Sequence, residues 1–135
     1  MIGHSNNSIS SYNEARKSIE HSPHRVISLL LSGFMERIKR AKVSMENKDV
    51  KGKVDCLLNC VEIVDGLRLS LDLEKGGDLA ANLDALYEYV SFRLVEANMS
   101  NDPVILDEIT GLIGKIESAW LEIGDAVQGG QYGNA

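Results

Sequence analysis

The sequence predicts an all-α fold, an antiparallel up-down-up-down four-helix bundle with a flexible N-terminal arm. Three observations lead to this prediction. Apolar residues recur at spacings of three and four, which places them on one face of a helix. Aromatic residues make up only 5% of the chain, so aliphatic side chains must form the core. The only prolines, Pro23 and Pro103, leave about 80 residues between them in which no proline breaks a helix. Long helices joined by short connections become antiparallel neighbours.

The first helix is predicted to begin at Ser22-Pro23, because serine is a favoured N-cap and proline fits the first helical position. It is expected to end at Asn47-Lys48-Asp49. Residues 1–21 before it are mostly polar and form the expected arm. Apolar residues along the helix follow alternating steps of four and three. They are Ile27, Leu31, Phe34, Ile38, Ala41 and Met45.

The second helix is predicted from about Lys51 to Glu74. Gly76-Gly77 is the expected connection, since glycine readily adopts the left-handed conformation that ends helices. Apolar residues cover a wide arc of this helix in two stripes. They are Val54, Leu57, Val61, Val64 and Leu71, and beside them Cys60, Ile63 and Leu67.

The third helix is predicted to follow an N-cap at Asp78 and to close over Asn98–Asn101. Asp102-Pro103 then repeats the cap-and-proline start for a fourth helix that runs to about Val127. Both helices carry apolar stripes at helical spacing. The bundle is therefore expected over residues 22–127, with a flexible tail at 128–135.

The net charge of −6 is distributed unevenly. Residues 1–54 hold ten Lys/Arg and five Asp/Glu, whereas residues 55–135 hold four Lys/Arg and fifteen Asp/Glu. A basic half raises the question of nucleic acid. The alternative, which we favour, is that the cations of the first helix lie beside an acidic surface of the same molecule. Those cations are Arg37, Lys39, Arg40 and Lys42.

Nucleic acid and membrane are not expected as partners, because the whole chain is acidic and its longest apolar run, Val26–Met35, is too short to span a bilayer. The N-terminus has no secretory signal pattern. Two cysteines, Cys56 and Cys60, are spaced for one helix face and are expected as free thiols. These features predict a cytoplasmic protein.

Constellations for catalysis or for a cofactor are missing from the sequence. None of the three histidines lies within a core stripe, and solvated side chains are expected for them; they are His4, His21 and His24. No Glu-x-x-His pair projects from a helix, as a metal-binding bundle requires, and no phosphate loop follows a strand. We expect no metal, no cofactor and no enzymatic activity.

The later helices carry more apolar residues than one seam of a bundle needs. Excess apolar surface on a protein often marks a partner site. A wider core explains the same pattern equally well, because a bundle helix can bury half its circumference. The pattern alone leaves both alternatives open.

An ordered set of motifs decides between them. Ser22-Pro23-His24 precedes an apolar helix, LDLEKGGDLAANLDALYEYVSFRLVEANMSND follows from Leu71 to Asp102, and LDEITGLIGKIESAW ends at Trp120. In this order the motifs resemble the flagellar secretion chaperone family, FliS, over about residues 12–120. The resemblance implies a bundle that binds the disordered C-terminal segment of flagellin in the cytoplasm, prevents premature polymerisation and aids delivery to the flagellar type III export apparatus.

The resemblance also allows two further partners, the flagellar export gate and an accessory co-chaperone. The alternative from a different class is a non-catalytic helical scaffold that self-associates through the same apolar surface. A chaperone should stay soluble and form a one-to-one complex with its client, whereas a scaffold should assemble as its concentration rises.

Candidate site residues come from the motif positions and from the second helix. In the motif, an aromatic residue buries well at an interface and an amide can bond an extended backbone. The expected client-binding residues are Ile63, Leu67, Leu71, Asn82, Tyr87 and Asn98. The leucines of the motif, Leu83, Leu86 and Leu94, are expected in the core, and Trp120 fits either the core or the groove.

In the family, an arm with a tyrosine can fold over the groove while flagellin is absent. The resemblance places Tyr12 at this position, and Ile9 lies one helical turn before it. Ile9 and Tyr12 are therefore candidates for a removable lid. The alternative is an arm that is simply disordered.

Overall fold

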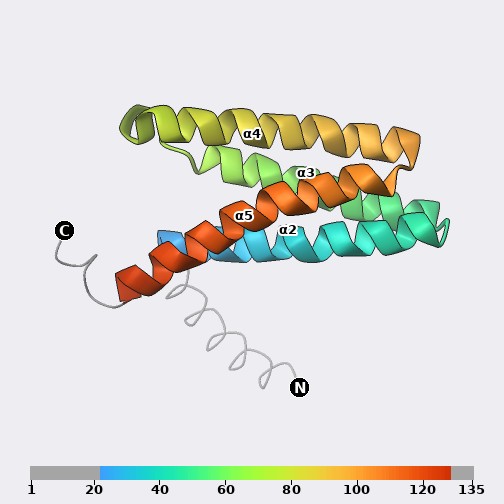
Figure 1. Cartoon of the computed structure of the whole chain (residues 1–135), viewed down its shortest axis with the longest axis horizontal. Helices are drawn as coiled ribbons and strands as arrows, with labels where there is room; N and C mark the ends of the chain where they lie inside the picture. The colour runs from blue at the N-terminus through green and yellow to red at the C-terminus, as the bar shows by residue number, and fades with distance from the viewer. Residues whose placement is uncertain (1–21, 129–135) are drawn as a thin grey trace, which may run out of the picture.

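The structure is a computed structural model, and it describes residues 22–128, with side chains as far as Ile123. The described chain consists of four helices and contains no strand (Figure 1). The helices are α2 (Pro23–Glu46), α3 (Val50–Leu69), α4 (Leu73–Ser100) and α5 (Pro103–Gln128). The all-α prediction is confirmed. The expected arm and tail lie outside the described residues, apart from Gln128, which ends α5.

The helices form a closed ring of neighbours. α2 packs against α3 and α5, and α4 packs against the same two helices on the other side. Figure 1 shows that α5 runs obliquely, from the end of α4 across the first part of α2. The first half of α4 and the second half of α5 therefore diverge, and the bundle is tighter at one end than at the other.

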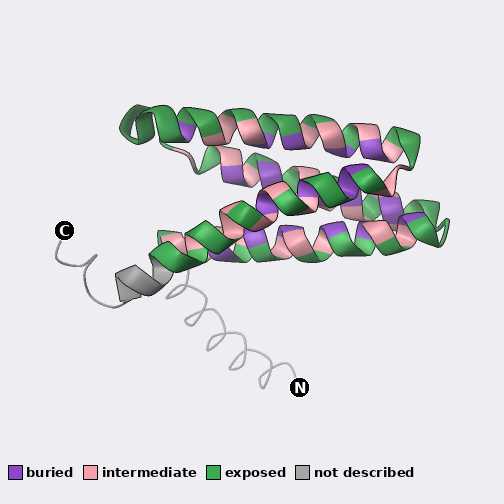
Figure 2. Ribbon diagram, in the orientation of Figure 1, coloured by how far each residue is buried: buried purple, intermediate pink, exposed green. Residues whose placement is uncertain are grey.

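Aliphatic side chains fill the core, as the low aromatic content predicts. Buried residues form inward-facing stripes on the helices (Figure 2). The largest fully buried side chains are Phe34, Leu31, Ile38, Leu67, Leu94, Leu106, Ile109, Ile113, Val64, Val90 and Cys60. Burial of each large aliphatic side chain contributes roughly 1.5–3 kcal/mol, so these stripes provide the main driving force for folding. Burial also raises the pKa of the Cys60 thiol to about 12, which keeps it protonated and unreactive.

The start of α2 and that of α5 follow the cap-and-proline prediction. The Ser22 hydroxyl accepts a hydrogen bond from Arg25 N at 3.3 Å, with Pro23 in the first helical position. The Asp102 carboxylate accepts one from Val104 N at 3.0 Å. These side chains satisfy backbone N–H groups that have no partner inside the helix.

The predicted end of the second helix near Glu74 is wrong, because the chain turns before it reaches Gly76-Gly77. The chain leaves α3 after Leu69, and residues 70–72 connect it to α4. The Ser70 hydroxyl donates to Leu67 O at 2.6 Å, and the Asp72 carboxylate accepts from Lys75 N at 3.0 Å. Asp72 therefore caps the helix that was expected to begin after Asp78, because an aspartate that follows a helix end can serve as an N-cap wherever the chain turns.

Gly76 and Gly77 lie at a kink in α4, where a short first segment and the long second segment of the helix meet. Gly77 has φ +54° and ψ −134°, which kinks the helix and which a residue with a Cβ adopts only with strain. A Cβ on Gly76 would lie 2.5 Å from the Cβ of Ala80. The two glycines thus allow the first turn of α4 to fold back against the rest of the helix. Gly77 has the positive φ expected there, but its ψ of −134° lies far from the left-handed helical region, so it forms a kink rather than a helix C-cap.

Lys53 ties the first turn of α3 to the last turn of α4. Its side chain is buried between the two helices, and its Nζ donates to Asn98 O at 3.0 Å and to Asn101 Oδ1 at 2.6 Å. Asn101 is the left-handed cap of α4, with φ +54°. Carbonyl groups at a helix end attract cations. Lys53 therefore fixes where α4 ends relative to α3, a role that the spacing of apolar residues does not indicate.

Replacing Lys53 with methionine keeps most of the apolar stem but removes both hydrogen bonds. We expect Lys53→Met to lower the free energy of unfolding by about 2–4 kcal/mol, because each of the two part-buried bonds to a charged donor contributes about 1.5–3 kcal/mol. Urea unfolding followed by circular dichroism measures this. The matched control is Lys51→Met, since exposed Lys51 pairs only with Asp55 one turn away; it should cost about 0.5 kcal/mol or less. Equal effects of the two substitutions would contradict the role given to Lys53.

Candidate binding surface

An apolar groove lies at the end of the bundle where α4 and α5 diverge. Its volume is about 670 Å³, and residues of all four helices or their connections line it. We call it the open-end groove. Its apolar lining includes Val26, Ile27, Leu71, Leu79, Leu83, Tyr87, Ile116 and Trp120. The groove exists because the oblique course of α5 leaves the apolar faces of the first half of α4 and the second half of α5 without a partner helix.

Trp120 closes one side of this groove by pairing with His24. The two rings stack with centroids 4.8 Å apart and planes 5° from parallel. Trp120 Nε1 donates to His24 O at 3.0 Å, and His24 Nε2 lies 2.6 Å from Trp120 O. Because a carbonyl oxygen only accepts, His24 carries a proton on Nε2. The solvated side chain expected for His24 is therefore wrong, and Trp120 both packs against the core and lines the groove.

A second, smaller hollow of about 100 Å³ lies between α3 and α4, and we call it the α3–α4 groove. Its lining is apolar apart from one amide. It consists of Val54, Leu57, Leu58, Val61, Leu94, Val95 and Asn98. Phe92 and Met99 lie one turn before and one turn after Val95 on α4, and they are 63% and 78% exposed. The groove and these two side chains form an apolar strip on the surface.

The structure distributes the expected client-binding residues unequally between these grooves. Leu71 and Tyr87 line the open-end groove, where Tyr87 is only 3% exposed. Asn98 lines the α3–α4 groove. Asn82 is exposed on α4, outside both linings. The fold thus brings Leu71 and Tyr87 together and separates them from Asn98.

The two candidates on α3 lie deeper. Leu67 is 1% exposed and belongs to the core, and Ile63 is half-buried against it. The lid candidates Ile9 and Tyr12 lie outside the described residues. Of the expected core leucines, Leu94 is buried, whereas Leu83 and Leu86 are half-buried.

Sequence reasoning missed the exposed strip beside the α3–α4 groove. Leu58 and Phe92 lie off the main apolar stripes of their helices, so a search for helical periodicity passes over them. A search for large apolar residues at positions where the periodicity predicts exposure to solvent could have found them. Val95, which broadens the apolar face of α4, and Met99 complete this pattern.

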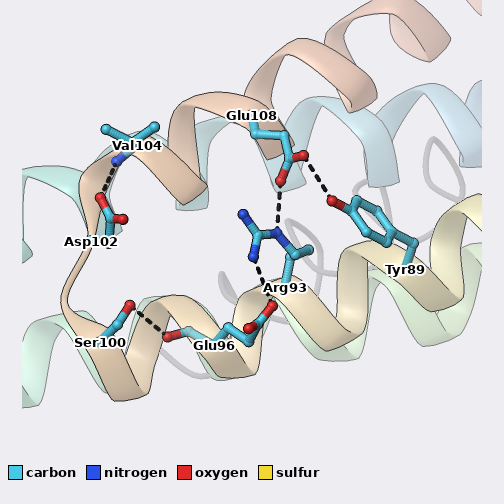
Figure 3. Close-up of polar contacts among 7 residues, drawn as sticks. All are labelled: Tyr89, Arg93, Glu96, Ser100, Asp102, Val104 and Glu108. Atoms are coloured by element: carbon cyan, nitrogen blue, oxygen red, sulfur yellow. Dashed lines mark hydrogen bonds and ion pairs between the residues drawn. The ribbon is translucent and has the colours of Figure 1, made fainter.

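Polar contacts hold the other edge of α4 against α5 (Figure 3). Arg93 Nε donates to Glu108 Oε1 at 2.8 Å, and the Tyr89 hydroxyl donates to Glu108 Oε2 at 2.8 Å. Arg93 Nη1 also donates to Glu96 Oε1 at 2.7 Å. The hydrogen bonds from Arg93 and then from Tyr89 lower the pKa of Glu108, because both stabilise the carboxylate. Tyr89 and Arg93 therefore position α4 against the first turns of α5.

On the edge toward α3, Arg68 and Asp84 form a two-point ion pair. Arg68 Nε lies 2.9 Å from Asp84 Oδ1, and Arg68 Nη2 lies 3.3 Å from Asp84 Oδ2. The hydrogen bond from Arg68 lowers the pKa of Asp84. Arg68 interrupts an apolar stripe of α3, and this pair explains its presence there.

The basic face of α2 meets the acidic part of the molecule at one ion pair. Lys42 Nζ lies 2.8 Å from Asp107 Oδ1 on α5, which confirms the expectation for Lys42. Arg37 instead pairs with Glu36 of its own helix.

Within residues 22–123, no group of three or more His, Cys, Asp or Glu side chains could hold a metal ion. None of the described helices is long and apolar enough to cross a membrane.

Comparison with known proteins points to one family. The model of the family described as flagellar protein FliS matches residues 5–127. A flagellar secretion chaperone FliSB of Pseudomonas aeruginosa is 46% identical over 99 residues, which is 73% of this chain and 79% of the relative. The flagellar secretion chaperone FliS of Salmonella typhimurium is 41% identical over 103 residues, 76% of each chain. That of Bacillus subtilis is 30% identical over 99 residues, 73% of each chain.

The Arg93–Glu108 pair makes stability depend on pH in the acid range. Because the folded-state pKa of Glu108 is lowered, its contribution is fully present above the ordinary value of 4.5 and is lost as pH falls through the folded pKa. We expect Glu108→Gln and Arg93→Gln each to reduce the loss of stability as pH falls below the ordinary glutamate pKa of 4.5. Urea unfolding at a series of pH values measures it, and added salt should weaken the effect in the parent protein. If the free energy of unfolding of both variants fell with decreasing pH as steeply as that of the parent protein, the role given to the Arg93–Glu108 pair would be contradicted.

Proposed function

The chain belongs to the FliS family of flagellar proteins, and from this premise we propose that it is a cytoplasmic export chaperone. In this proposal it binds the disordered C-terminal segment of flagellin, prevents premature polymerisation, and aids delivery to the flagellar type III export apparatus. The observation that carries the proposal is the pair of apolar grooves along α4, the open-end groove and the α3–α4 groove. A segment that is disordered when free can bury its apolar residues there by folding on binding.

The positions of the grooves support a client that wraps along α4. Leu79 lines the first groove and Asn98 lines the second, 19 residues apart on one helix. At the helical rise this is about 28 Å, which requires a client segment of roughly 8 residues if extended and about 19 if helical. A long client segment can therefore occupy both grooves at once.

The client contacts in this proposal keep the motif residues. Leu71 and Tyr87 contact the client in the open-end groove, Asn98 contacts it in the α3–α4 groove, and Asn82 contacts it from the exposed surface of α4. Ile63 and Leu67 act indirectly in this proposal. Leu67 is buried in the free protein and supports the packing of α3 against α4.

The lid is part of the same proposal. The N-terminal arm, with Ile9 and Tyr12, covers the open-end groove until flagellin displaces it. Pro23 and Val26 line this groove, so the arm joins the bundle at its rim. No cofactor, metal or catalytic step takes part. The export gate and an accessory co-chaperone are further partners in the proposal.

One exposed strip also supports the second candidate, a self-associating scaffold. Phe92, Val95 and Met99 present apolar surface that a second copy could cover as well as a client could. Light scattering at increasing protein concentration separates the two functions. A chaperone keeps one molecular mass and forms a one-to-one complex with the client, whereas a scaffold grows with concentration.

Binding should depend on the strip beside the α3–α4 groove. In calorimetry against a peptide of about 40 residues from the flagellin C-terminus, we expect one-to-one binding with a negative heat-capacity change, because apolar surface is buried. Val95→Glu should weaken binding at least tenfold, since it places a charge in the apolar contact. Val43→Glu is the matched control, because Val43 on α2 is 55% exposed and Val95 is 53% exposed. Equal affinities of the two variants would place the client elsewhere.

Deletion of residues 1–15 tests the lid. If the arm competes with the client for the open-end groove, the shortened protein should bind the flagellin peptide several-fold more tightly, because the competing segment is gone. It should also bind more of a dye that fluoresces on exposed apolar surface. Unchanged affinity and unchanged dye fluorescence would contradict the lid.

A further inference from the structure

The side-chain amide of Asn98 has an unusual environment. Its Oδ1 is buried, yet no donor among the described residues reaches it. Lys53 Nζ lies nearby but donates to the backbone oxygen of Asn98 and to Oδ1 of Asn101. Other polar side chains near helix ends find partners in their own helix, as Ser100 does with Glu96 O. The Asn98 amide is therefore the polar group of the α3–α4 groove that the free protein leaves unsatisfied.

An unsatisfied buried amide oxygen destabilises the free protein, whereas a leucine at the same position would be buried without this penalty. No hydrogen bond among the described residues fixes the orientation of this amide. It can present either its oxygen or its NH₂ group to a molecule that enters the groove. These properties fit a group that is satisfied by a bound partner.

The lining of the groove indicates which donor this partner supplies. All the other lining residues are aliphatic, including Leu58, Val61 and Val95, so the client side chains that fit there are apolar. The remaining donor on a client is a backbone N–H. In the interior of a helix every N–H is already bonded to a carbonyl four residues earlier, and only the first turn or a non-helical stretch has N–H groups to offer.

We propose that Asn98 accepts a hydrogen bond from a free backbone N–H of the client and so selects a segment whose helix begins or is interrupted at the α3–α4 groove. This inference rests on the proposed function, because it describes how the flagellin segment lies in one of the two grooves. Asn98 is then a specificity-determining residue that recognises the conformation of the client rather than one of its side chains.

Ser91 carries a second unsatisfied polar group of α4, although it is not among the residues that line the α3–α4 groove. It lies seven residues before Asn98 on the same face of α4, and its hydroxyl oxygen is also buried without a partner among the described residues. Two helical turns separate the two groups by about 10.5 Å.

A scan of amide-to-ester replacements in the flagellin peptide tests the inference, because each ester removes one N–H and leaves the side chains unchanged. Every peptide is measured against the full-length parent protein and against Asn98→Ala. We expect one position, or two adjacent ones, where the ester weakens binding to the parent about tenfold but weakens binding to Asn98→Ala less than twofold. Esters at all other positions should cost the same with both proteins.

Three variants sharpen the scan. Asn98→Asp keeps an acceptor and should keep the sensitivity to the ester, while Asn98→Leu should lose it and raise the midpoint of urea unfolding. Asn98→Leu also replaces the alanine variant if that protein fails to fold. Asn47→Ala is the control, an exposed amide outside the linings of both grooves, and should give the parental profile.

Equal ester effects in the parent and in Asn98→Ala at every position would overturn the inference while leaving the chaperone proposal intact. Failure of the unmodified peptide to bind the parent protein would overturn the chaperone proposal itself, and the inference with it.

Discussion

The arrangement of this bundle depends on the polar contacts that hold α4 to α5 on one side and to α3 on the other. Arg93 and Tyr89 bind Glu108 on one edge, and Arg68 binds Asp84 on the other. Lys53 of α3 holds the last turn of α4 by two hydrogen bonds. Polar contacts are directional, so they set the position of α4 more closely than apolar packing does. Because these polar contacts hold α4 in place, some of its apolar side chains can remain exposed to solvent.

The oblique course of α5 follows from two separate attachments. Near its start α5 is held to α4 by Glu108, and farther along it is held to α2 by the stacked pair of Trp120 and His24. A straight helix that meets α4 first and α2 later must leave α4 as it proceeds. The open-end groove is the space that results, and its floor is the aliphatic core that all four helices share.

Stability and binding place opposite demands on the surface of α4. Phe92 and Met99 would be better replaced by polar residues in a protein that functions alone, and the Asn98 amide would be better replaced by an aliphatic side chain. Each of these residues is unfavourable in the free protein, and in the proposed complex an apolar segment with a free N–H would cover it. The fold tolerates them because the stripes of buried Leu, Ile and Val on its inner faces provide the stability.

The sequence by itself determined the helices, most of their ends and the inward-facing stripes, because helical periodicity and N-cap chemistry are local properties of the chain. It also indicated the family, through an ordered set of motifs. Only the tertiary structure decided where the chain turns between α3 and α4, since both Asp72 and Asp78 are acceptable caps and Gly76-Gly77 can either end a helix or bend it. It also decided that Tyr87 is buried while Phe92 is exposed, and that His24 stacks on a tryptophan 96 residues away. The burial of Tyr87 and the stacking of His24 depend on contacts between residues distant in the sequence, which helical periodicity and cap chemistry do not encode.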